Sequence, residues 1–157
     1  MPLKKFILGD YIFTHKLNKL LKYFNSNNIE YKIINKELLF KIKLDNILIN
    51  CLAIIKDDKI TKFTFKKECV SDDESDKLKD YITSKYKKCY TFDDRKTVYD
   101  VYIVTSHGYK YLLRLYNLYD FQLEVSVEKN NEFKLFKHKQ TPLVATSDVP
   151  KEITKIN

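Results

Sequence analysis

The sequence predicts an α+β fold in which a helix followed by an antiparallel β-meander occurs twice within one domain. Two segments carry apolar residues at helical spacing, and each is followed by runs in which apolar and polar residues alternate. Short polar turns separate these runs, and turns of that length join antiparallel neighbours. The 157 residues have the length of one domain. We expect units over 1–67 and 68–139, packed as one domain 1–139, and a flexible tail over 140–157.

The first unit is expected to open with a helix after Thr14, its predicted N-cap. A single apolar stripe defines this helix, formed by Leu17, Leu20, Leu21 and Phe24. The run "NSNN" at 25–28 ends it, because short polar side chains compete for the backbone. Four strands are expected to follow, over 29–33, 38–44, 47–55 and 63–65.

The second unit is expected to open with a helix near "SDDESDKL". Ser71 and Glu74 have the spacing of a capping box, and an acidic first turn suits the positive end of the helix dipole. Helix-start chemistry therefore explains this acidic run without a metal site. The apolar side of the helix consists of Leu78, Tyr81, Ile82 and Tyr86, and the expected strands cover 99–103, 109–115, 121–127 and 133–135.

The two units align with an offset of about 61 residues. "HKLNKLL" (15–21) lies against "DKLKDYI" (76–82), and Phe40 lies against Val101. Residue identity between the units is low, so a true duplication and a chance likeness are both open. A repeat would give either one continuous curved sheet or two packed sheets, with both helices on the inner side.

The charge of the chain is concentrated in its first half. The formal net charge is +8, and residues 1–66 hold 13 lysines against 6 acidic residues. This excess of positive charge favours an acidic partner. The alternative is that lysine is simply the polar residue this chain uses most on its solvent-exposed faces. Lys, Ile, Asn, Tyr and Phe abound while Gly occurs twice. This usage is typical of an AT-rich genome and is compatible with a viral or phage accessory protein.

Cysteine usage and hydropathy indicate a soluble protein of a reducing compartment. Three cysteines, Cys51, Cys69 and Cys89, cannot all pair within the chain, and no C-x-x-C spacing occurs. The N-terminal "MPLKKFILGDYIF" has an apolar run that Gly9-Asp10 interrupts, which argues against a signal peptide. No apolar stretch approaches the ~18 residues of a membrane span.

The segments that most resemble chemical sites are better explained as turns and loops. Ser106-His107-Gly108 lies between two alternating runs, so a hairpin loop is favoured over catalysis, with Gly108 in the left-handed conformation. Asp93-Asp94-Arg95 is expected to be a loop with at most a surface ion pair. His15 and His138 are not spaced as metal ligands of one element. Neither a cofactor nor a metal is expected.

These patterns predict a non-enzymatic binding protein with a protein partner, ahead of nucleic acid. If the ligand is nucleic acid, the expected contacts are Lys32, Lys41, Lys43 and Lys62, which lie on or beside strands of the basic half. Tyrosines near the second meander are expected to serve mainly as core and half-buried strand residues. They are Tyr99, Tyr102, Tyr109, Tyr111, Tyr116 and Tyr119. A homodimer through an edge strand is left open.

Overall fold

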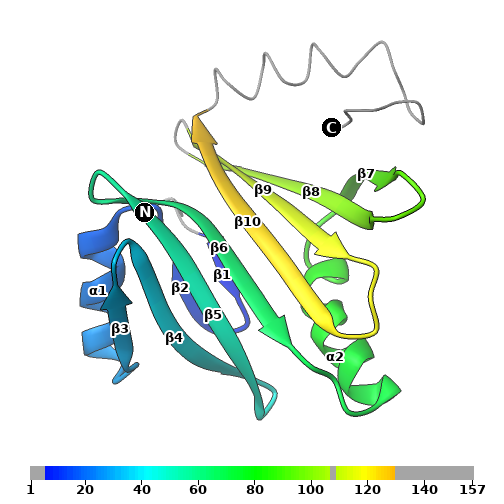
Figure 1. The fold of residues 1–157 in the computed structure, drawn as a ribbon, viewed down its shortest axis with the longest axis horizontal. Coiled ribbons are helices and arrows are strands. Elements are labelled where there is room, and N and C mark those ends of the chain that lie inside the picture. The colour runs from blue at the N-terminus through cyan, green and yellow to red at the C-terminus, as the bar shows by residue number, and fades with distance from the viewer. Residues whose placement is uncertain (1–5, 107–108, 130–157) are drawn as a thin grey trace.

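The computed structural model describes residues 6–106 and 109–129, and these form a mixed α+β fold dominated by antiparallel sheet (Figure 1). The first half contains β1 (Phe6–Leu8), β2 (Tyr11–Phe13), α1 (Leu17–Ser26), β3 (Tyr31–Ile34), β4 (Glu37–Leu44), β5 (Ile47–Lys56) and β6 (Lys59–Lys67). The second contains α2 (Asp72–Thr83), β7 (Lys88–Asp93), β8 (Val98–Ser106), β9 (Tyr109–Tyr116) and β10 (Phe121–Lys129).

In the described part of the chain, eight strands form one continuous sheet in the order β3-β4-β5-β6-β10-β9-β8-β7. Strands β6 and β10 join the two halves antiparallel, with Phe65 opposite Leu123. Of the two arrangements that the sequence left open, the structure has the single sheet. The four strands of the second meander are β7–β10, so a strand over 88–93 was missed. The expected strand at 133–135 and the tail at 140–157 lie outside the described residues.

Tight turns set the register of the first meander. Two residues connect β4 to β5 and two connect β5 to β6, and all four have a positive φ between 52° and 65°. Hairpins of this type need left-handed residues, and Asp and Asn adopt that conformation more readily than other non-glycine residues. They are Asp45, Asn46, Asp57 and Asp58.

The inner face of the sheet packs against both helices and against the β1–β2 hairpin (Figure 1). In α1, Phe24 is fully buried and its ring centroid lies 4.7 Å from that of Phe40 on β4. In α2, Leu78 and Ile82 are fully buried. The alternation along each strand explains this arrangement, because residues two apart point to the same face.

The β1–β2 hairpin was not predicted from the sequence. Its turn contains Gly9 at φ 61°, where a Cβ atom would lie 2.7 Å from Leu44 Cδ2. Phe6 and Phe13 project from the hairpin into the core and are fully buried. The Tyr86 hydroxyl donates a hydrogen bond of 2.9 Å to the carbonyl of Ile7, so the hairpin also contacts the segment after α2.

The two helix starts differ from each other in how well they were predicted. At α2 the capping prediction is confirmed, because the Glu74 backbone N–H donates to Ser71 Oγ at 3.1 Å. At α1 the prediction of Thr14 is wrong, since the N-cap is Lys16. The reason is tertiary: the His15 carbonyl accepts a 2.7 Å hydrogen bond from Ile60 N–H, and Lys16 pairs with Lys59. This sheet-like pairing keeps residues 15–16 extended.

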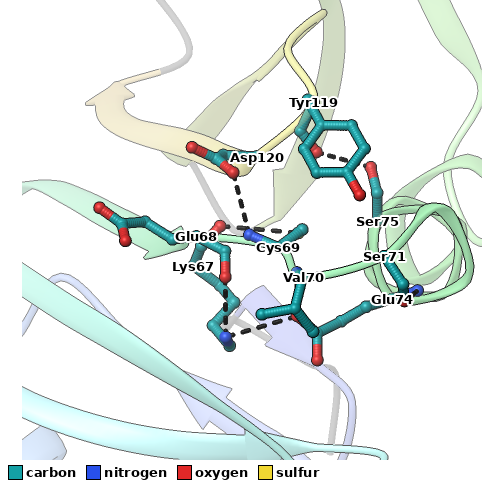
Figure 2. A network of polar contacts seen from close by, with 9 residues as sticks. All are labelled: Lys67, Glu68, Cys69, Val70, Ser71, Glu74, Ser75, Tyr119 and Asp120. Carbon is teal, nitrogen blue, oxygen red and sulfur yellow. Dashed lines mark hydrogen bonds and ion pairs between the residues drawn. The ribbon is translucent and has the colours of Figure 1, made fainter.

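The loop between β6 and α2 is tied to the loop between β9 and β10 (Figure 2). The Cys69 backbone N–H donates to Asp120 Oδ1 at 2.9 Å, and the Ser75 hydroxyl donates to the Tyr119 carbonyl at 2.7 Å. The Lys67 ammonium contacts Glu74 Oε1 at 3.4 Å. The first two contacts fix the start of α2 to the second half of the sheet, and the ion pair links it to the end of β6.

Candidate functional site

The outer face of the sheet is the candidate site, because the described helices and the β1–β2 hairpin all pack on the inner face (Figure 1). We define the outer face by the strand residues that alternate with the core. On β3–β6 they are Lys32, Ile34, Glu37, Leu39, Lys41, Lys43, Leu48, Asn50, Leu52, Ile54, Lys62, Thr64 and Lys66. On β7–β10 they include Phe92, Tyr99, Arg114, Tyr116, Gln122, Glu124 and Ser126. Val101 and Leu112 share this face by register but are buried, so this end of the face is not an open surface at those two positions.

The fold brings all four sequence-predicted lysines to the outer face. Lys41 lies opposite Asn50, and Lys43 lies opposite Leu48. Lys32 lies opposite Leu39 on the neighbouring strand. Lys62 differs from the other three, because its ammonium lies 3.6 Å from Glu124 Oε2 on β10. Its charge is therefore partly neutralised within the chain.

Sequence reasoning missed Lys66 as a member of this group. Lys66 lies opposite both Asn50 and Gln122 and is exposed. The alternation of Lys62, Thr64 and Lys66 along β6 was the available signal, since residues two apart share a face.

Aliphatic side chains lie between these lysines. Ile34 is 50% exposed and Leu48 is 44% exposed, although both are large apolar residues. Leu39 and Leu52 lie directly opposite each other and are half-buried. The β3–β6 part of the outer face therefore combines positive charge with apolar surface that a partner can cover.

Aromatic rings occupy the other end of the outer face. Phe92 stacks on Tyr99 with centroids 4.9 Å apart, and Tyr99 lies 5.1 Å from Tyr116. The Arg114 guanidinium lies 5.7 Å from the centre of the Tyr99 ring, a cation–π distance. The Tyr116 hydroxyl donates to Glu124 Oε1 at 3.0 Å. Burial, and then the Glu124 carboxylate, raise the pKa of Tyr116, so its hydroxyl stays a donor.

The tyrosines are divided between the two faces, as core and half-buried strand residues. Tyr102 and Tyr111 are buried on the inner face, whereas Tyr99 and Tyr116 are half-buried on the outer face. Tyr119 lies in the β9–β10 loop and is 52% exposed. The rings of the outer face contact one another and Arg114, which leaves them less free to stack on a ligand.

The remaining candidate residues from the sequence lie away from the outer face or outside the described residues. Strands β8 and β9 pair antiparallel as a hairpin, but Ser106, which was predicted to lie in the loop, is the last residue of β8 and pairs with Tyr109. His107, Gly108 and His138 lie outside the described residues. The carboxylate of Asp94 accepts hydrogen bonds from the Lys96 and Thr97 backbones, which lower its pKa. Within 6–106 and 109–129, no three His, Cys, Asp or Glu side chains gather as metal ligands.

His15 is nearly buried at the start of α1, and it gives the fold a testable pH dependence. Burial, followed by the charges of Lys16, Lys59 and Lys19, lowers the pKa of His15 below its ordinary 6.5. The unfolded chain then binds more protons than the folded chain as the pH falls below 6.5. The free energy of unfolding should therefore decrease in that window.

We expect His15→Gln to lose the part of this pH dependence that comes from His15, while its free energy of unfolding at about pH 7 stays close to that of the wild type. Urea unfolding from about pH 8 to about pH 5 should show a smaller decrease in the variant than in the wild type. Parallel curves for the two proteins would mean that His15 is protonated equally in both states.

Comparison with models of protein families, with curated proteins and with solved structures found no match, so the site is interpreted from its own geometry. No helix in the described part of the chain is both long and apolar enough to cross a membrane.

Proposed function

We propose that the protein is a non-enzymatic binding protein whose outer sheet face contacts a protein partner that carries acidic side chains. The observation that supports this most is the β3–β6 surface, where exposed Ile34 lies two positions from Lys32 on β3 and exposed Leu48 lies opposite Lys43. Lysines attract and orient an acidic partner, and covering the aliphatic side chains stabilises the complex. We assign no catalytic step to the described residues.

The aliphatic content favours a protein partner over nucleic acid. Single-stranded nucleic acids bind best where exposed aromatic rings stack on bases. On this face the exposed apolar residues are Ile34 and Leu48, whereas Tyr99 and Tyr116 are half-buried and contact other side chains. Ile and Leu offer little to a base but pack well against the apolar side chains of a protein.

Nucleic acid is the second candidate, and the lysine distribution supports it. Lys32, Lys41, Lys43 and Lys66 lie on β3, β4 and β6, three of the four adjacent strands β3–β6, with β5 between β4 and β6. With strands about 4.8 Å apart, this surface is wide enough to contact several phosphates.

The test uses a charge-reversal variant with a matched control. Lys32, Lys41, Lys43 and Lys66 are changed to Glu together, and Lys62 is kept because its reversal would repel Glu124. The control changes Lys19, Lys22, Lys85 and Lys87, which are exposed and lie on α1 and in the segment after α2. Both variants have the same net charge, so a difference between them reports on position.

Two probes are titrated in a salt series: peptides that combine Glu with Leu or Ile, and a mixed pool of single-stranded and duplex nucleic acid. We expect the outer-face variant to bind the peptides at least roughly 10-fold more weakly than the control. Stronger binding to nucleic acid, with a linear log–log salt dependence, would favour the second candidate. Equal affinities of the two variants would contradict a role of this face.

We infer further that the two halves arose from a repeat and that the protein works in a reducing compartment. The strand order supports the repeat, because the last strands of the two halves, β6 and β10, pair at the centre of the sheet. From there β5, β4 and β3 follow outward on one side, and β9, β8 and β7 follow outward on the other. For the second, Cys51 and Cys69 are buried free thiols, and burial raises the pKa of Cys51 well above its ordinary value.

A further inference from the structure

Strand β3 forms one edge of the sheet and exposes an apolar side chain on each face. Ile33, on the inner side, is 46% exposed, and Ile34, on the outer side, is 50% exposed. Both flank a backbone edge that is free among the described residues, because within 6–106 and 109–129 β3 pairs with β4 alone (Figure 1). Edge strands usually present charges or irregular backbone there, since an open edge invites pairing with another strand.

The direction of the free backbone groups follows from the β3–β4 hairpin. Two residues, Asn35 and Lys36, connect the strands, and Ile34 lies opposite Glu37. The residues that flank a two-residue loop exchange both hydrogen bonds, and bonded pairs then alternate. The Lys36 carbonyl accepts from Ile55 N–H at 2.8 Å, which agrees with this alternation. The N–H and C=O of Ile33 therefore point away from β4, to the free edge.

We propose that two copies of this chain pair antiparallel through β3, with Ile33 opposite Ile33 across a two-fold axis. In this register the free N–H of each Ile33 donates to the free C=O of Ile33 in the other copy. Lys32 lies opposite Ile34 of the second copy, so no two lysines face each other. A register centred on Lys32 would place like charges directly opposite, which is destabilising.

The opposite edge of the sheet explains why the assembly closes at two copies. Strand β7 begins with Lys88 and ends with Asp93, and its pairing with β8 shifts register between Lys88 and Tyr90. An irregular, charged edge does not continue the sheet. Pairing at β3 alone is isologous and gives a closed dimer. This proposal does not rest on the proposed function.

The test measures the oligomeric state of the full chain by sedimentation across a concentration series, without any ligand. We expect a monomer–dimer equilibrium in the wild type and at least a tenfold weaker one in Ile33→Pro, which removes the outward N–H without removing a β3–β4 hydrogen bond. Ile33→Lys repeats the test without a proline, and circular dichroism confirms that each variant is folded. Leu48→Lys, on the outer face but away from the edge, should leave the equilibrium unchanged.

Substitutions of Ile34 test the register itself. Ile34→Glu should tighten the dimer several-fold, because it places a carboxylate opposite Lys32 of the second copy, whereas Ile34→Lys should weaken it. The opposite order would overturn the Ile33-centred pairing. A wild type that stays monomeric at hundreds of micromolar, or a dimer indifferent to both Ile33 variants, would overturn the proposal.

Discussion

Phe13→Ala should lower the free energy of unfolding by about 3–5 kcal/mol, the range for a buried phenylalanine that leaves a cavity. Phe13 is fully buried, and its ring contacts aromatic rings from three other strands. The centroid distances are 5.2 Å to Phe65, 5.4 Å to Phe63, 5.9 Å to Phe6 and 6.1 Å to Phe40. Removal of the ring therefore leaves a cavity between the hairpin and the inner face and weakens the packing of the hairpin on the sheet.

The control for this experiment is Phe13→Leu, which keeps most of the apolar volume. Its loss should be clearly smaller, about 1–2 kcal/mol, because a leucine refills part of the cavity. Equilibrium unfolding in urea measures both values. A loss below about 1 kcal/mol in the alanine variant would show that the hairpin contributes little to the core.

Alternation made the long strands predictable. Between Leu38 and Leu44 every second residue is buried, because one face meets the core and the other does not. The same holds from Phe121 to Val125 on β10. At the second helix the capping residues are local in sequence, so their pattern was sufficient to find its start.

Features set by distant contacts were not predictable. Strands β1 and β2 have three residues each, too few to show a period, and their burial depends on β4 and β6. The pairing of β6 with β10 joins residues more than 50 positions apart, which no local pattern encodes. The wrong N-cap at α1 has the same origin, because Ile60 and Lys59 determine where that helix begins.

The outer face likewise combines features that local sequence patterns predict with features that depend on distant contacts. Its lysines alternate with core residues, so their common face was readable within each strand. The contacts among Arg114, Tyr99 and Tyr116 depend on the register between β8, β9 and β10, and only the structure reveals them. The exposed edge of β3 likewise follows from the order of strands, which places β3 outermost.

Asp120→Ala and Ser75→Ala should each destabilise the fold by about 1–2 kcal/mol, because each removes one hydrogen bond that ties the start of α2 or the loop before it to the β9–β10 loop. The Asp120 carboxylate is the acceptor for the Cys69 backbone N–H, whereas the Ser75 hydroxyl donates to the Tyr119 carbonyl (Figure 2). Asp120→Asn keeps an acceptor oxygen and should lose less. Asp76→Ala, an exposed site on α2, serves as the surface control.

The double variant, Asp120→Ala with Ser75→Ala, tests whether the two hydrogen bonds are energetically coupled. Both bonds hold the β9–β10 loop against residues 69–75 around the start of α2, so the loss of one leaves the other less well ordered. We expect the double variant to lose less than the sum of the single losses, with a coupling of about 0.5–1 kcal/mol in urea unfolding. Full additivity would mean that the loops are held independently. These two hydrogen bonds help to align the two halves of the sheet. Asp120 directly precedes β10, and the pairing of β10 with β6 joins the halves.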